Sequence, residues 1–192
     1  MPDTIYDDVF LLNLKLCRHL WNMTNAGNNP DLFSGKLIYP QYRKSASGAR
    51  EPYRVCEQET RILLANLIER SNRIFYAVET PTEKTYQQKG VGERSARCDM
   101  SLYTLYRQSS FKKITNIELK AGTPVASDLG KDLEKVLREG LFGNWIHTIG
   151  RISEGSFQQT YLDRYIQAMR DTHQKIIDDH HESDLGDRIV DI

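Results

Sequence analysis

The chain has 192 residues, of which 39% are hydrophobic and 27% are charged, and its formal net charge is zero. This composition is typical of one soluble globular domain over residues 1–192. No apolar run approaches the ~20 residues of a membrane helix, and the acidic start lacks the basic region of a signal peptide, so we expect a cytoplasmic protein with no membrane partner. The three cysteines are scattered singly, so neither a disulfide framework nor a thiolate zinc site is indicated.

The first 55 residues form a predicted N-terminal extension, made of a helix and a long loop. Residues 5–21 place apolar side chains at helical spacing, in a stripe so wide that we expect it to be covered on most sides. Residues 22–55 carry Asn, Gly, Pro and Ser turn signals, which indicate an irregular segment able to serve as a binding loop.

A predicted catalytic core over residues 57–150 begins with the clearest helix of the chain. Residues 57–70 carry acids in the first turn and an arginine at the end, as the helix dipole favours. A short strand over residues 74–78 follows and is predicted to stop at Pro81. The polar, glycine-containing residues 82–96 are predicted to form a loop.

The rest of the core alternates strands with one helix. Residues 97–106 and 111–120 alternate apolar and polar side chains and are predicted strands, joined by a four-residue turn. Residues 127–139 have an apolar face typical of a helix, and residues 144–149 form a short fourth strand.

Residues 151–192 are predicted to form a C-terminal helix, over residues 156–179, and an acidic tail. The order of helix, helix, three strands, helix, strand and helix predicts an α/β (α+β) fold, in which helices flank a small mixed sheet.

Acidic side chains share one face of the second and third predicted strands. Side chains alternate between faces, so Glu118 and Lys120 lie together on the third strand. If the turn has four residues, Tyr106 pairs with Phe111 and Asp99 lies directly opposite Glu118, with Cβ atoms ~5 Å apart. A register slip of one residue would move the two acids to opposite faces.

Two carboxylates placed in this way repel each other unless a cation joins them. Lys120 is one such cation, and a divalent metal ion is another; oxygen ligands alone favour Mg²⁺ or Mn²⁺. A metal there would activate water and stabilise charge on a phosphate, and Lys120 would orient the water or stabilise the oxyanion. The set predicts phosphodiester hydrolysis, and the alternative is a solvated sheet face with a cross-strand salt bridge.

An Asp on one strand, followed by Glu118-Leu119-Lys120 on the next, resembles the PD-(D/E)XK nuclease superfamily. The core of that superfamily is a helix, three strands, a helix and a further strand, an order that residues 57–147 follow. The resemblance implies a restriction-endonuclease-like core, metal ligation by Asp99, Glu118 and the Leu119 carbonyl, and a catalytic role for Lys120. It covers about half the chain, and Cys98 stands where proline commonly precedes the aspartate.

Many members of this superfamily add a glutamate from the helix before the first strand. Glu57 and Glu59 are the two choices in this chain, and we favour Glu59 as a catalytic residue because it is in register with Leu63 and Leu67. The alternatives are that Glu59 is a surface acid and that Glu57 only complements the helix dipole.

The neutral total conceals two basic stretches, over residues 34–55 and 84–113, and an acidic tail. Basic segments can hold a phosphate backbone, and ordinary solvated loops are the alternative. We expect the nucleic-acid contacts to come from Arg94, Arg97, Lys112 and Lys113.

The expected function is therefore that of a metal-dependent nuclease. The resemblance implies DNA rather than RNA as substrate and a role in restriction or phage defence. One alternative is a catalytically silent nucleic-acid-binding module of the same fold. Another is a regulatory subunit or homo-oligomer that pairs through its C-terminal helix.

Overall fold

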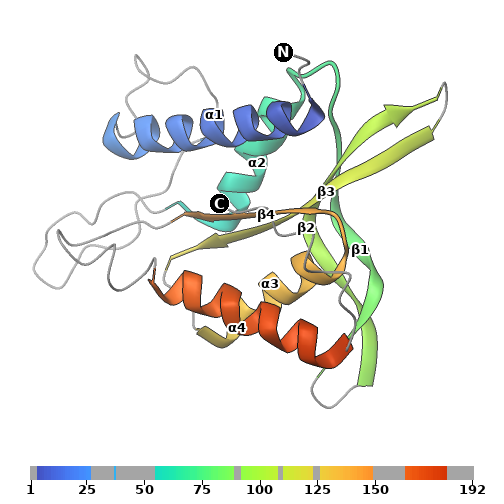
Figure 1. Cartoon of the computed structure of the whole chain (residues 1–192). Helices are drawn as coiled ribbons and strands as arrows, with labels where there is room; N and C mark the ends of the chain where they lie inside the picture. The colour runs from blue at the N-terminus through green and yellow to red at the C-terminus, as the bar shows by residue number, and fades with distance from the viewer. Residues whose placement is uncertain are drawn as a thin grey trace, which may run out of the picture.

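In the computed structural model, residues 4–26, 37, 55–88, 92–107, 110–122, 126–148 and 163–180 are described. They form an α+β fold around a four-stranded sheet (Figure 1), which confirms the predicted fold class. In chain order the elements are α1 (Ile5–Ala26), α2 (Glu57–Ile68), β1 (Phe75–Gln88), β2 (Gly92–Tyr106), β3 (Ser110–Ala121), α3 (Ala126–Arg138), β4 (Phe142–Thr148) and α4 (Asp163–His180).

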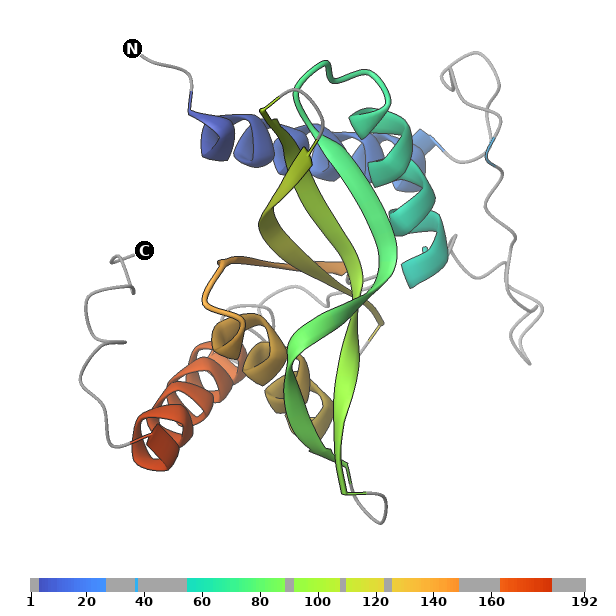
Figure 2. The same ribbon diagram turned by 90° about the vertical axis from the view of Figure 1, so that its right-hand side faces the viewer.

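The strands lie in the order β1-β2-β3-β4, with the first two pairings antiparallel and the β3–β4 pairing parallel. A parallel pair needs a long crossover connection, and α3 lies within it. In Figures 1 and 2, α1 and α2 lie together on one side of the inner strands, and α3 and α4 lie on the other. Residues 114–119 of β3 are all buried, as expected for a strand that is covered on both faces.

Helix α1 contributes one buried stripe to the core, formed by Val9, Leu12, Leu16 and Leu20. Its central turn is also tied to β4 by two reciprocal amide hydrogen bonds. The Asn13 Nδ2 donates to Asn144 Oδ1 (3.2 Å), and the Asn144 Nδ2 donates to Asn13 Oδ1 (3.0 Å). These bonds satisfy side-chain amides that are otherwise costly to bury.

The expectation that α1 would be covered on most sides is wrong. Phe10 and Trp21 keep 61% and 70% of their surface exposed, although the buried stripe is on the same helix. Two adjacent apolar stripes share this helix, and only one of them faces α2 and the sheet.

The predicted loop over residues 82–96 is also wrong, because strands occupy most of it. β1 continues through Pro81 to Gln88, and β2 already begins at Gly92. β1 is at the edge of the sheet, where the missing N–H of a proline can face away from the neighbouring strand. The register shifts between Pro81 and Thr85, just after the proline.

The turn between β2 and β3 differs from the prediction by one residue. Tyr106 pairs with Ser110, not with Phe111. An irregularity between Leu102 and Tyr103 takes up the difference, so that Met100 lies opposite Ile117, as predicted.

The interface between α3 and β4 depends on a glycine. A Cβ atom at Gly143 would lie 1.9 Å from Cγ1 of Val136, so strand and helix approach closely there. Helix α4 packs on α3 and buries Thr172 and Ile176. The predicted start of this helix near residue 156, the acidic tail and most of the predicted 22–55 loop lie outside the described residues.

No helix among the described residues has the length and apolar character required to cross a membrane.

Candidate functional site

Asp99 lies beside the Glu-Leu-Lys segment of β3, on the adjacent strand. Its Oδ2 accepts a hydrogen bond from the backbone N–H of Leu119 at 2.7 Å, and its Oδ1 accepts one from Arg61 of α2 at 2.8 Å. Arg61 also donates to Glu79 at 2.8 Å. Leu119 follows Glu118 directly, and the charge of Asp99 acts on the Glu118 carboxyl, so the two predicted acids lie near each other.

Glu118 is a buried carboxylate, with only 2% of its surface exposed. Burial raises its pKa to about 7, and the charges of Asp99 and Asp132 act in the same direction, while Lys135 opposes them. The Lys135 Nζ, from α3, lies 2.9 Å from Glu118 Oε1. Burial lowers the pKa of Lys135, but the neighbouring carboxylates outweigh burial and raise it, which keeps this lysine charged.

Lys120 is held between the two helices that flank its end of the strand. Its Nζ is 2.9 Å from Asp132 Oδ2 of α3 and 3.9 Å from Glu57 Oε1 of α2. Burial lowers the pKa of Lys120, yet the hydrogen bond to Asp132 and the nearby acids raise it overall. Asp132 also lies 3.1 Å from Lys135, so one carboxylate joins both lysines.

The two helical glutamates have different roles in this arrangement. Glu59 reaches back to accept a hydrogen bond from the Cys56 N–H, which forms a capping box at the start of α2. Glu57 is the one that approaches Lys120. The structure therefore brings Glu57, and not the favoured Glu59, next to the predicted site.

Of the residues predicted to contact nucleic acid, Lys112 and Lys113 lie away from this site, whereas the Arg97 carbonyl accepts a hydrogen bond from the Lys135 Nζ at 3.3 Å. The side chain of Arg94 lies outside the described part of the chain, and Arg97 is exposed on β2. Lys112 is exposed near the start of β3, and Lys113 Nζ is 3.9 Å from Glu83 Oε1. Lys113 and Lys112 are about 23 and 26 Å along the strand from Lys120, at ~3.3 Å per residue.

Four charged residues of this site, Arg61, Glu79, Asp132 and Lys135, were not predicted. Asp132 and Lys135 lie on α3 next to the buried Leu133 and Val136. The helical pattern could have identified Asp132 and Lys135, because charged side chains that flank an apolar stripe lie at the edge of a buried face.

The ionic network has more negative than positive charge. Three cations are joined to five carboxylates at distances of 2.8–3.9 Å, an excess of two acids. The cations are Arg61, Lys120 and Lys135, and the carboxylates are Glu57, Glu79, Asp99, Glu118 and Asp132. Carboxylate oxygens in excess fit a hard divalent cation.

Asp99 and Glu118 are two carboxylates, and a divalent cation held by them would need further oxygen ligands. Within the described ranges, no three His, Cys, Asp or Glu side chains are grouped so that they could hold a metal ion by themselves.

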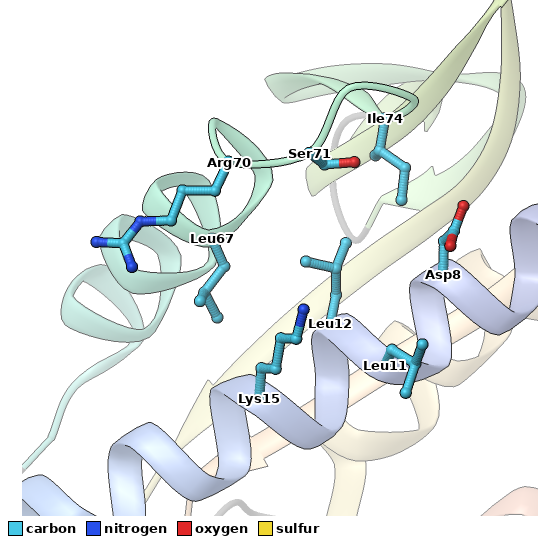
Figure 3. A pocket seen from close by; sticks show the side chains of 8 residues that line it. All are labelled: Asp8, Leu11, Leu12, Lys15, Leu67, Arg70, Ser71 and Ile74. Carbon is cyan, nitrogen blue, oxygen red and sulfur yellow. The ribbon is translucent and has the colours of Figure 1, made fainter.

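A pocket of about 310 Å³ lies elsewhere, between α1 and the C-terminal end of α2 (Figure 3). Its lining mixes apolar side chains with Asp8, Lys15 and Arg70. Arg70 is thirteen residues from Glu57, or about 20 Å along a helix at ~1.5 Å per residue. The pocket is therefore separate from the ionic network.

The interpretation of the site depends on the geometry and chemistry of its own residues. Comparison of the chain with protein-family models, with curated proteins and with solved structures finds no match.

Proposed function

We propose that this chain is a Mg²⁺- or Mn²⁺-dependent nuclease of the PD-(D/E)XK type that hydrolyses phosphodiester bonds in DNA. The observation that carries the proposal is the 2.7 Å hydrogen bond from the Leu119 N–H to Asp99. It brings an aspartate of β2 to the Glu118-Leu119-Lys120 segment of β3. The order α2, β1, β2, β3, α3 and β4, together with Glu57 beside Lys120, supports the proposal.

Asp99, Glu118 and the Leu119 carbonyl would hold the divalent cation. When bound, the cation supplies positive charge for the phosphate and lowers the pKa of water. Lys120 is kept protonated by Asp132 at 2.9 Å, so it can donate a hydrogen bond to a phosphate oxygen and stabilise negative charge in the transition state. Glu57, at 3.9 Å, helps to orient the same ammonium group.

Arg61 and Lys135 have a complementary role. They lie within 2.8 and 2.9 Å of the Asp99 and Glu118 carboxylates, so neither acid is buried without a counter-charge. Removing a partner from such a pair leaves an uncompensated charge, which strongly destabilises a fold. Arg61 and Lys135 therefore offset the repulsion between two acids on adjacent strands.

The test is cleavage of plasmid DNA and single-stranded DNA with Mg²⁺, with Mn²⁺ and with EDTA. We expect metal-dependent cleavage by the wild type and a loss of roughly 100- to 1,000-fold in Lys120→Ala, because an oxyanion-stabilising group is removed. Lys175→Ala is the matched control, since Lys175 also pairs with a carboxylate at 2.9 Å, that of Glu134, outside the site.

Equal cleavage by Lys120→Ala and Lys175→Ala would contradict the proposal. Binding of DNA without cleavage under every condition would favour a catalytically silent binding module instead. The biological role within the proposal is restriction or phage defence. Reduced phage plating on cells that produce the wild type, but not on cells that produce Lys120→Ala, would support that role.

A further inference from the structure

The outer half of the β2–β3 hairpin projects beyond the helices, at the upper right of Figure 1. Large apolar side chains are exposed there: Phe75 at the start of β1, Leu105 on β2 and Phe111 on β3 have 41%, 54% and 57% of their surface exposed. Exposed aromatic side chains grouped on one element indicate a binding surface more often than isolated ones do.

Strand pairing places these side chains on one face of the sheet. Phe75 pairs with Tyr103, and Leu105 pairs with Phe111. The rings of Phe75 and Phe111 are in edge-to-face contact, with centroids 4.9 Å apart. The neighbouring Leu102 belongs to the core with α1 and α2, so the aromatic residues lie on the opposite face.

The charge of this hairpin is entirely positive. Residues 100–117 contain Arg107, Lys112 and Lys113 and no Asp or Glu. The guanidinium of Arg107 lies 5.1 Å from the ring centroid of Tyr106, where a cation and an aromatic ring present a joint surface. Cations next to exposed rings match a partner that has both anionic groups and flat π-systems.

We propose that this aromatic face, formed by Phe75, Tyr103, Leu105 and Phe111, binds single-stranded nucleic acid. Unstacked bases offer their faces to aromatic side chains, while Arg107 at the turn and Lys113, which pairs with Tyr103 on this face and lies 3.9 Å from Glu83, attract the phosphates. A duplex hides its base faces within the stack, so it cannot use these rings. For the proposed nuclease, this surface selects single-stranded nucleic acid as the substrate. Only this link to cleavage rests on the proposed function.

The experiment measures fluorescence anisotropy of a labelled oligothymidylate in EDTA, so that cleavage does not occur. Phe111→Ala is expected to bind roughly 5- to 140-fold more weakly than the wild type, because one base loses its stacking partner. Phe10→Ala is the matched control, since Phe10 is an equally exposed phenylalanine (61%) on α1, and it is expected to bind as the wild type does. An unlabelled single strand should compete better than a duplex of the same length.

Equal binding by Phe111→Ala and the wild type would overturn the inference, and so would equal weakening by Phe10→Ala or equal competition by the duplex. Far-UV circular dichroism verifies that both variants are folded. Cleavage with Mg²⁺ is measured separately on the wild type and Lys120→Ala. Binding that depends on Phe111, with no cleavage, would support this binding surface and refute the nuclease. Cleavage that depends on Lys120, with binding that does not depend on Phe111, would support the nuclease and refute this surface.

Discussion

The buried carboxyl of Glu118 makes the stability of the fold depend on pH. Its pKa rises from an ordinary 4.5 to about 7 on folding, chiefly because only 2% of the residue remains exposed. The folded state therefore binds the proton more tightly, and its stability falls as the pH rises from 4.5 through 7. At 1.36 kcal/mol per pKa unit, the full loss is about 3 kcal/mol at pH 8.

Glu118→Gln keeps the shape of the side chain and removes its ionisation. We expect the free energy of unfolding of Glu118→Gln, relative to the wild type, to rise by about 3 kcal/mol between pH 4 and pH 8. Urea denaturation followed by circular dichroism at a series of pH values measures this difference. An unchanged difference, or one that favours the wild type at high pH, would refute the reasoning and show that the ion pair with Lys135 outweighs burial.

Three further outcomes are expected from chemical denaturation and thiol labelling. Gly143→Ala should destabilise the fold by about 1–3 kcal/mol because its methyl group would overlap a side chain of α3. Gly130→Ala, whose methyl group would make only an ordinary contact at 3.8 Å, should stabilise α3 by up to about 1 kcal/mol. A similar loss of stability in both variants would argue against the close approach of β4 to α3 at Gly143. Arg61→Gln should cost about 2 kcal/mol, since two carboxylates lose a charged hydrogen-bond donor, and an unchanged denaturation midpoint would exclude that contribution. With Ellman's reagent, the exposed Cys17 should react in the native protein and Cys98 only after unfolding, because Cys98 is 1% exposed and burial raises its pKa to about 12; early reaction of both would contradict this burial.

The pairing of β2 with β3 shows what the amino-acid pattern can and cannot predict. The predicted register of Met100 with Ile117 came from an assumed four-residue turn, and it is correct because the irregularity between Leu102 and Tyr103 compensates for a shorter turn. The turn was predicted one residue too long, since turn length depends on local conformation around Arg107, which has a positive φ of 56°. A bulge absorbs such an error without changing the faces near Asp99.

Partners that come from helices were the hardest to predict. Asp99 and Glu118 follow from strand periodicity, but Arg61 and Lys135 reach them through the docking of α2 and α3, which no local pattern encodes. We favoured Glu59 because it is in register with apolar residues of the helix. A glutamate at the third helical position can also cap the helix, and Glu59 does so.

The amide pair between α1 and β4 has a consequence for biosynthesis. Asn13 and Asn144 are 131 residues apart, so α1 leaves the ribosome well before β4, and its central polar contact forms only when β4 has been made. At ~5–20 residues per second, that interval is roughly 7–26 s. During this time Val9, Leu12, Leu16 and Leu20 lack part of their final covering, which makes the nascent N-terminal helix a natural client of chaperones.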